Sequence, residues 1–169
     1  MANLHRHRSR AIVDGITRAP HRAFLRATGM DEAAMQKPFV AIVDTYGENS
    51  PCSMSLNQVS DNVRLGVAAG GGVPIRGSAI SVTDGTSMNH SGMRMSLVSR
   101  EIVADSVEGF VRAHGYDALV GVAGCDKSLP GIMMGMVRVN LPGVFLYGGA
   151  MLPGVAPGQI PGVAGRNDR

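Results

Sequence analysis

Apolar residues in this chain gather in four short runs, and polar or glycine-rich segments separate them. Short runs of branched apolar side chains between turn residues are typical of strands that are buried on both faces of a sheet. The sequence therefore predicts strands at 39–43, 79–82, 118–123 and 144–147.

Between these runs, apolar residues recur at the spacing of an α-helix. The predicted helices cover 12–28, 56–69, 93–113 and 130–139. Gly15 and Pro20 weaken or divide the first of them. In the long third helix, the side chains expected to face the core are Met95, Val98, Ile102, Val103, Val107, Phe110 and Val111. Alternation of strands and helices predicts an α/β fold with a doubly wound, mainly parallel sheet flanked by helices.

Composition favours one compact domain, because 44% of the 169 residues are hydrophobic. The net charge of +3 comes largely from arginines before residue 27, but no aromatic interleaving or known motif accompanies them, which disfavours nucleic-acid binding. No apolar run reaches the ~18 residues that span a bilayer, so no membrane partner is expected. Residues 152–169 are rich in Pro and Gly and predict an irregular tail.

The candidate chemistry lies in the predicted loops that follow the strands. Ligands of open parallel sheets bind beyond the carboxyl ends of the strands, and these loops carry Cys52, then Asp84, then Cys125, Asp126 and Lys127. Thiolates select iron in clusters and carboxylates select magnesium, so the mixture predicts a soft metal site beside a hard one. From spacing alone, the alternative to a metal site is that both cysteines are inert buried thiols. The alternative to metal binding by Lys127 is an ion pair with Asp126.

Several motifs in succession resemble the dihydroxy-acid dehydratase and 6-phosphogluconate dehydratase family. They are Pro51-Cys52, Thr83-Asp84-Gly85-Thr86-Ser87-Met88, Gly92-Met93-Arg94, residues 96–108, Gly124-Cys125-Asp126-Lys127, Pro130-Gly131 and Tyr147-Gly148-Gly149. The resemblance runs from about residue 9 to 154. It divides the chain into a basic arm at 1–8, a truncated dehydratase domain at 9–154 and the tail at 155–169. It leaves no room for a presequence, so we expect a cytoplasmic protein.

The resemblance implies specific roles for the loop residues. Cys52 and Cys125 would be ligands of a [2Fe-2S] cluster, with [4Fe-4S] as the alternative. Asp84, Asp126 and Lys127 would bind Mg²⁺, the lysine as a carbamate. The implied reaction is the dehydration of a 2,3-dihydroxy carboxylic acid to a 2-oxo acid in branched-chain amino acid biosynthesis (valine and isoleucine), carried out by a homodimer at full length.

Two departures from the family pattern accompany the resemblance. Ser55 stands where the family usually has histidine, and Asn89 and Ser91 replace a glycine and an acidic residue. The family's third cluster cysteine, a further magnesium carboxylate and a serine base would all lie beyond residue 169. We therefore expect an incomplete N-terminal domain that is inactive alone. The alternatives are a sugar-acid dehydratase of the same family and a non-catalytic α/β fragment or interaction module.

Overall fold

A four-stranded, fully parallel sheet forms the centre of the computed structural model, which describes residues 8–151 and 154. The strands are β1 (Phe39–Asp44), β2 (Val73–Ser78), β3 (Ala118–Ala123) and β4 (Gly143–Tyr147), in the spatial order β2-β1-β3-β4. β1 lies between β2 and β3, pairing Val40 with both Pro74 and Ala118. The predicted α/β class and the parallel sheet are confirmed.

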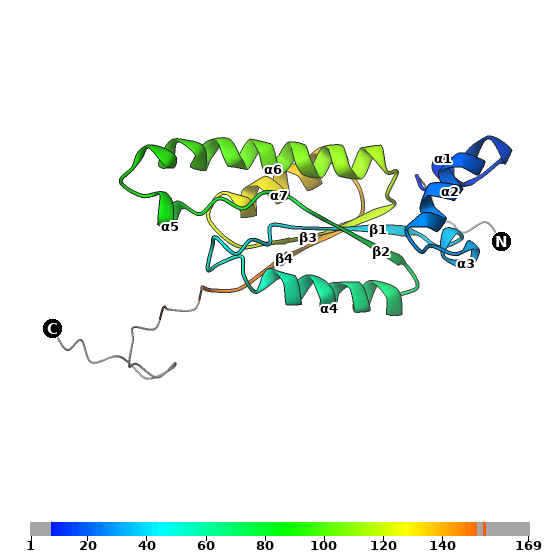
Figure 1. Cartoon of the computed structure of the whole chain (residues 1–169), viewed down its shortest axis with the longest axis horizontal. Helices are drawn as coiled ribbons and strands as arrows, with labels where there is room; N and C mark the ends of the chain where they lie inside the picture. The colour runs from blue at the N-terminus through cyan, green and yellow to red at the C-terminus, as the bar shows by residue number, and fades with distance from the viewer. Residues whose placement is uncertain (1–7, 152–153, 155–169) are drawn as a thin grey trace.

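Helices cover both faces of this sheet (Figure 1). α4 (Leu56–Ala69) lies on one face, and α6 (Arg94–Ala113) and α7 (Ser128–Val139) lie together on the other. The larger core cluster fills the space beneath α6 and α7, and a smaller one built on Ile42, Leu56 and Val122 lies beneath α4. The predicted helices at 56–69, 93–113 and 130–139 are thus found with end shifts of at most two residues.

The second strand was predicted at the wrong place. The structure puts β2 at Val73–Ser78, whereas residues 79–82 follow it as irregular chain. β2 contains Pro74, Arg76 and Gly77, which do not read as a buried strand, but it is an edge strand, where proline is tolerated. Its Arg76 is neutralised by Asp44 of β1, with 2.6 Å between Nε and Oδ2.

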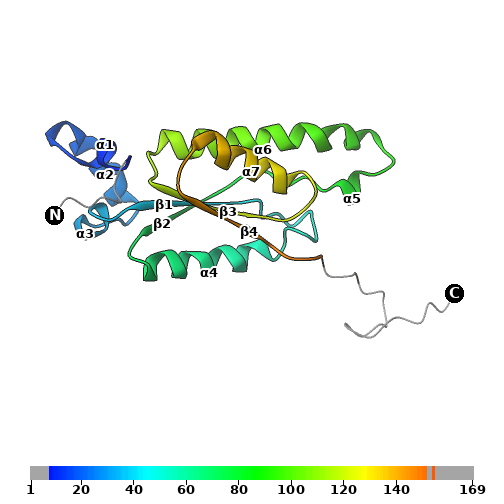
Figure 2. The same cartoon turned by 180° about the vertical axis from the view of Figure 1, so that it is seen from behind.

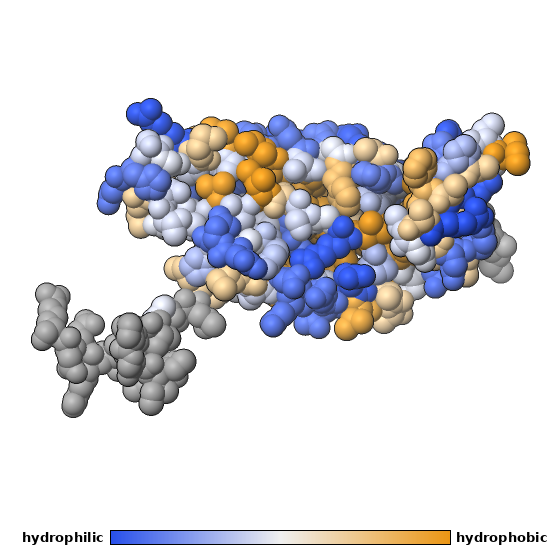
Figure 3. Space-filling model, in the orientation of Figure 1, coloured by the Kyte–Doolittle hydropathy of each residue, from blue (hydrophilic) through white to orange (hydrophobic). Residues whose placement is uncertain are grey.

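The predicted buried face of α6 is correct in only one half. Val103, Val107 and Val111 are buried, but Met95, Val98 and Ile102 are 51%, 45% and 39% exposed. The residues buried near the start of the helix are Ser96 and Ser99, whose hydroxyls have hydrogen-bond partners. Figure 3 shows an apolar patch over the α6 side of the molecule, near the short helix α5 (Asp84–Ser87).

Short helices occupy the opposite end of the molecule, at the amino ends of the strands (Figure 2). They are α1 (Arg10–Val13), the 3₁₀ helix η1 (Ile16–Arg18), α2 (Ala19–Ala27) and α3 (Glu32–Met35). The predicted helix at 12–28 is divided as expected, because Gly15 adopts φ 91° and Pro20 falls in the first turn of α2.

Asp117 attaches this amino-terminal segment to the sheet. Its buried carboxylate accepts hydrogen bonds from the backbone N–H groups of Arg8, Ser9 and Phe39 at 2.7, 3.0 and 2.9 Å. Most of the basic arm predicted at 1–8 and all of the tail at 155–169 lie outside the described residues. Within the described ranges, no helix is both long and apolar enough to cross a bilayer.

Candidate metal centre

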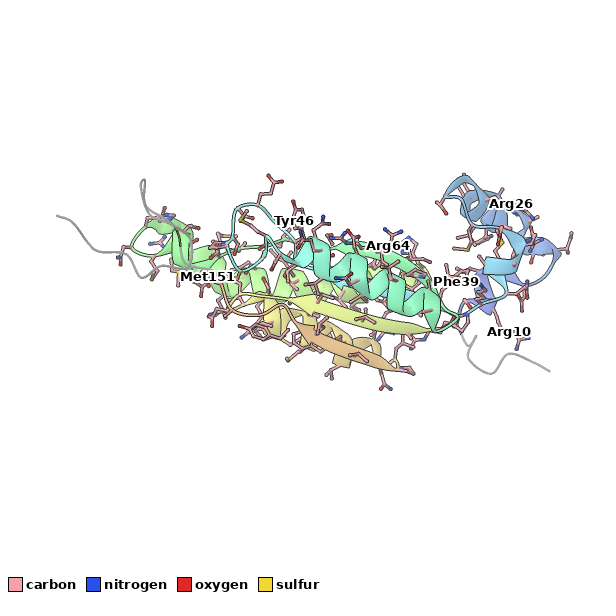
Figure 4. The ribbon with its side chains drawn as sticks, turned by 90° about the horizontal axis from the view of Figure 1, so that it is seen from below. Arg10, Arg26, Phe39, Tyr46, Arg64 and Met151 are labelled. Atoms are coloured by element: carbon pink, nitrogen blue, oxygen red, sulfur yellow. The ribbon has the colours of Figure 1, made fainter. Side chains whose placement is uncertain are left out.

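Three loops meet at the carboxyl end of the sheet, as the parallel topology requires. The loop after β1 carries Cys52, the segment after β2 carries Asp84, and the loop after β3 carries Cys125, Asp126 and Lys127. Because β1 lies between β2 and β3, these loops are neighbours. Figure 4 shows this end by the labels Tyr46 and Met151, with Arg10 and Arg26 at the far end.

The loop that carries Cys52 is held at both ends. Asp44, at the end of β1, is fully buried and accepts hydrogen bonds from Ser60, Ser78 and Arg76 at 2.7, 2.9 and 2.6 Å. Further along, Ser81 fixes the loop, because its carbonyl accepts a bond from Asn49 and its hydroxyl contacts that of Ser53 at 2.8 Å. The segment misread as a strand at 79–82 is therefore a support for the cysteine loop.

The two cysteines lie side by side, close enough that each thiol shifts the pKa of the other. Gly124 permits this approach, because a Cβ atom at that position would stand 2.2 Å from the Cys52 carbonyl oxygen. The Ser50 hydroxyl lies 3.5 Å from the Cys52 sulfur. Both thiols are free and partly buried.

The two sulfurs have different acidities. Burial raises the pKa of the Cys52 thiol, and the adjacent Cys125 raises it further against the opposing bond from Ser50. Burial also acts to raise the pKa of Cys125, but hydrogen bonds from Thr83, Cys52 and two backbone amides outweigh it, so that pKa falls below its ordinary value. Cys125 is therefore the sulfur more readily present as the thiolate that binds metal.

Cys125 has a left-handed backbone, with φ 74°. This conformation costs a non-glycine residue about 1 kcal/mol or more, and such strain clusters at functional sites. Asn89 likewise adopts φ 62° at the position where the family usually has glycine. Asparagine is among the side chains that best tolerate this region.

A second cluster beside the thiols contains Asp84, Asp126 and Lys127. Lys127 donates hydrogen bonds to both carboxylates, at 3.3 Å to Asp84 Oδ2 and in close contact with Asp126. The ion pair between Lys127 and Asp126, the competing role for the lysine, is thus present in this structure. The Asp126 side chain raises the pKa of Lys127, and Asp84 adds to the shift.

Asp84 is the most strongly anchored member of this cluster. The hydroxyl of Ser96 donates to its Oδ1 at 2.5 Å and is the main reason that the pKa of Asp84 is lowered, with further contributions from Asp126 and Lys127. Sequence reasoning missed Ser96, Thr83 and Gly124. The signal for Ser96 was its place in the first turn of a helix that follows a candidate ligand loop.

The donor chemistry fits two metal centres in part. The sulfur pair suits iron and the oxygen pair suits a hard cation, yet nowhere in residues 8–151 do three or more His, Cys, Asp or Glu side chains gather as a cation site. His90 contributes no ligand here, because its ring nitrogens contact Gly92 N and Thr86 O, each at 3.0 Å.

Comparison with known proteins identifies the family. Residues 37–166 match the model of the dihydroxy-acid/6-phosphogluconate dehydratase N-terminal region. The chain belongs to this family. It is 66% identical to dihydroxy-acid dehydratase 2 of Bordetella bronchiseptica over 94% of its length and 52% identical to dihydroxy-acid dehydratase 3 of Bradyrhizobium diazoefficiens over 94%.

Both relatives are much longer proteins. The aligned region makes up 28% of the Bordetella protein and 27% of the Bradyrhizobium protein, and 25% of a 54% identical dihydroxy-acid dehydratase from Pelagibacter ubique. The family resemblance predicted from the motifs is confirmed, and the chain spans little more than a quarter of these relatives.

Proposed function

We propose that this chain supplies the amino-terminal, metal-binding part of a hydro-lyase that converts 2,3-dihydroxy carboxylic acids to 2-oxo acids. The observation that carries the proposal is the meeting of a thiol pair with a carboxylate-lysine cluster at one sheet edge in a member of the dehydratase family. The relatives named above are all dihydroxy-acid dehydratases, which favours branched-chain dihydroxy acids as substrates.

In this proposal, Cys52 and Cys125 hold a [2Fe-2S] cluster and Asp84, Asp126 and Lys127 hold Mg²⁺. When bound, the two groups would supply Lewis acidity toward the leaving hydroxyl and charge to bind the substrate carboxylate. The thiol contact supports the first assignment, because both sulfurs can reach one iron only if they lie together. The adjacency of the two carboxylates supports the second.

Lys127 requires a chemical change to act as a ligand. As an ammonium it neutralises Asp84 and Asp126 and competes with a cation for them. Reaction of the neutral amine with CO₂ forms an N–C bond and releases one proton. The product is a carbamate, whose oxygens would serve as metal ligands alongside the two carboxylates. The side chain is 24% exposed, so CO₂ can reach it.

The remaining parts of the site come, in this proposal, from polypeptide that corresponds to the rest of the relatives. Those parts are a third cluster cysteine, a further carboxylate and the serine base that takes the C2 proton. The full enzyme is proposed to act as a cytoplasmic homodimer. Exposed apolar residues on β4 and α7 suit burial by that polypeptide, namely Val144, Leu146, Tyr147, Met133 and Val137.

The test is reconstitution under anaerobic conditions with iron, sulfide, Mg²⁺ and bicarbonate, with the downstream polypeptide of a relative supplied in trans. The expected result is visible cluster absorbance and turnover of 2,3-dihydroxyisovalerate, both lost in Cys52→Ser and Cys125→Ser. Ser55→Ala is the matched control. Ser55 lies three residues after Cys52, its side chain is exposed, and it makes no capping hydrogen bond to α4. It should retain both signals.

Each contrary outcome has a distinct meaning. Turnover of 6-phosphogluconate with no turnover of the branched-chain acid would replace the substrate by a sugar acid. If the complex forms but shows neither cluster absorbance nor turnover, the chain would instead be a non-catalytic interaction module. Cluster absorbance that survives Cys125→Ser would refute the assignment of that ligand.

A further inference from the structure

Asp84 lies on an element that cannot position it by packing. α5 (Asp84–Ser87) is a single turn, and none of its residues is buried. The Asp84 side chain itself is 20% exposed. A carboxylate on so short and open a turn has several rotamers available, so its direction must come from a contact outside α5.

That contact is the hydroxyl of Ser96. Ser96 is 3% exposed and lies in the first turn of α6, a 20-residue helix that packs along α7. It donates to Asp84 Oδ1 at 2.5 Å, while Oδ2 of the same carboxylate faces Lys127 at 3.3 Å. One oxygen is thus bound to the rigid helix, and the other is presented to the cluster.

From this division of the two oxygens we infer that Ser96 is a positioning residue for the hard-cation site. It holds Asp84 so that Oδ2 points toward Lys127 and Asp126, where the cation would bind. The inference rests on the proposed function, because it assumes that Asp84 is a ligand. Groups that orient a ligand from the second sphere typically change metal affinity by about 10- to 100-fold when they are removed.

The chain offers a matched control in Ser99. It is one helical turn from Ser96, has the same 3% exposure, and donates to the Ser96 carbonyl at 2.6 Å instead of to a carboxylate. Ser96→Ala and Ser99→Ala therefore remove the same atom from equally buried sites on one helix. Only the first removes a bond to the cluster.

The experiment measures Mn²⁺ binding by electron paramagnetic resonance, with bicarbonate present, to the full chain reconstituted with the downstream polypeptide of a relative. Ser96→Ala is expected to weaken binding about tenfold, Ser96→Thr to restore most of it by keeping a hydroxyl, and Ser99→Ala to stay within about twofold of the unmodified chain. If Ser96→Ala and the unmodified protein bound Mn²⁺ with equal affinity, the inference about Ser96 would be overturned, while the proposed cation site would not be. No Mn²⁺ binding by the unmodified reconstituted protein would overturn both.

A second measurement needs no metal. Amide hydrogen exchange of residues 84–88 reports how firmly α5 is held. In the metal-free chain, Ser96→Ala is expected to accelerate this exchange several-fold, whereas Ser99→Ala leaves it unchanged. Exchange at 84–88 that is identical in all three proteins would show that Ser96 does not hold α5, and the inference would be wrong.

Discussion

The contact between α6 and α7 depends on glycine, and adding one methyl group tests it. An ideal Cβ at Gly135 of α7 would stand 2.5 Å from the Cβ of Val107 and 3.0 Å from the carbonyl oxygen of Ala104, both buried on α6. Ordinary carbon–carbon contacts are about 3.5–4.0 Å. Gly135→Ala therefore forces the two helices apart by about 1 Å.

The magnitude follows from two opposing effects. Overpacking of this kind costs about 2–3 kcal/mol when a helix backbone has to move, and replacing glycine by alanine within a helix returns about 1 kcal/mol of propensity. We expect a net loss of about 1–2 kcal/mol in the free energy of unfolding, which for a chain of this size lowers Tm by about 2–8 °C.

The assay is urea unfolding followed by circular dichroism, with Gly109→Ala as the control. Gly109 lies within α6, is exposed, and would have nothing within 4 Å of a Cβ. It should gain about 0.5–1 kcal/mol from propensity alone. If Gly135→Ala were as stable as Gly109→Ala, the close helix contact would not exist in solution.

Three further predictions concern single contacts. Burial raises the pKa of Tyr116, which is 3% exposed, to about 12. Since this tyrosine ionises near pH 10 in the unfolded chain, the free energy of unfolding should fall by up to about 2.7 kcal/mol between pH 10 and 12. Tyr116→Phe should show less of this loss in urea titrations. Asp117→Asn should cost about 2–4 kcal/mol in the same assay, because the carboxylate accepts three backbone bonds; a loss under 0.5 kcal/mol would contradict the anchoring role. Gly124→Ala should slow the diamide-driven formation of a disulfide between Cys52 and Cys125 at least about tenfold, since the added Cβ meets the Cys52 carbonyl. Counting free thiols over time measures the rate, and the control Gly85→Ala should leave the rate unchanged.

The hydrophobic pattern determined the class of fold and most of its elements. Strands with continuous apolar runs, such as 39–43 and 118–123, can be read from sequence because both of their faces are buried. β2 could not be, because an edge strand meets the core only in part and tolerates Pro74 and Arg76. The α6 face was misread because the residues buried near its start are Ser96 and Ser99, which bury hydroxyls with hydrogen-bond partners. Periodicity of large apolar side chains does not detect them.

The candidate site divides in the same way. The sequence by itself determined which loops carry thiols and carboxylates, because in a parallel sheet every strand end leads to the same edge. Only the tertiary structure decided that Cys52 contacts Cys125 through the space left by Gly124, and that Ser96 and Lys127 take opposite oxygens of Asp84. These contacts join residues that are 12 to 73 positions apart. Their distances depend on how helices and loops pack, which no local pattern encodes.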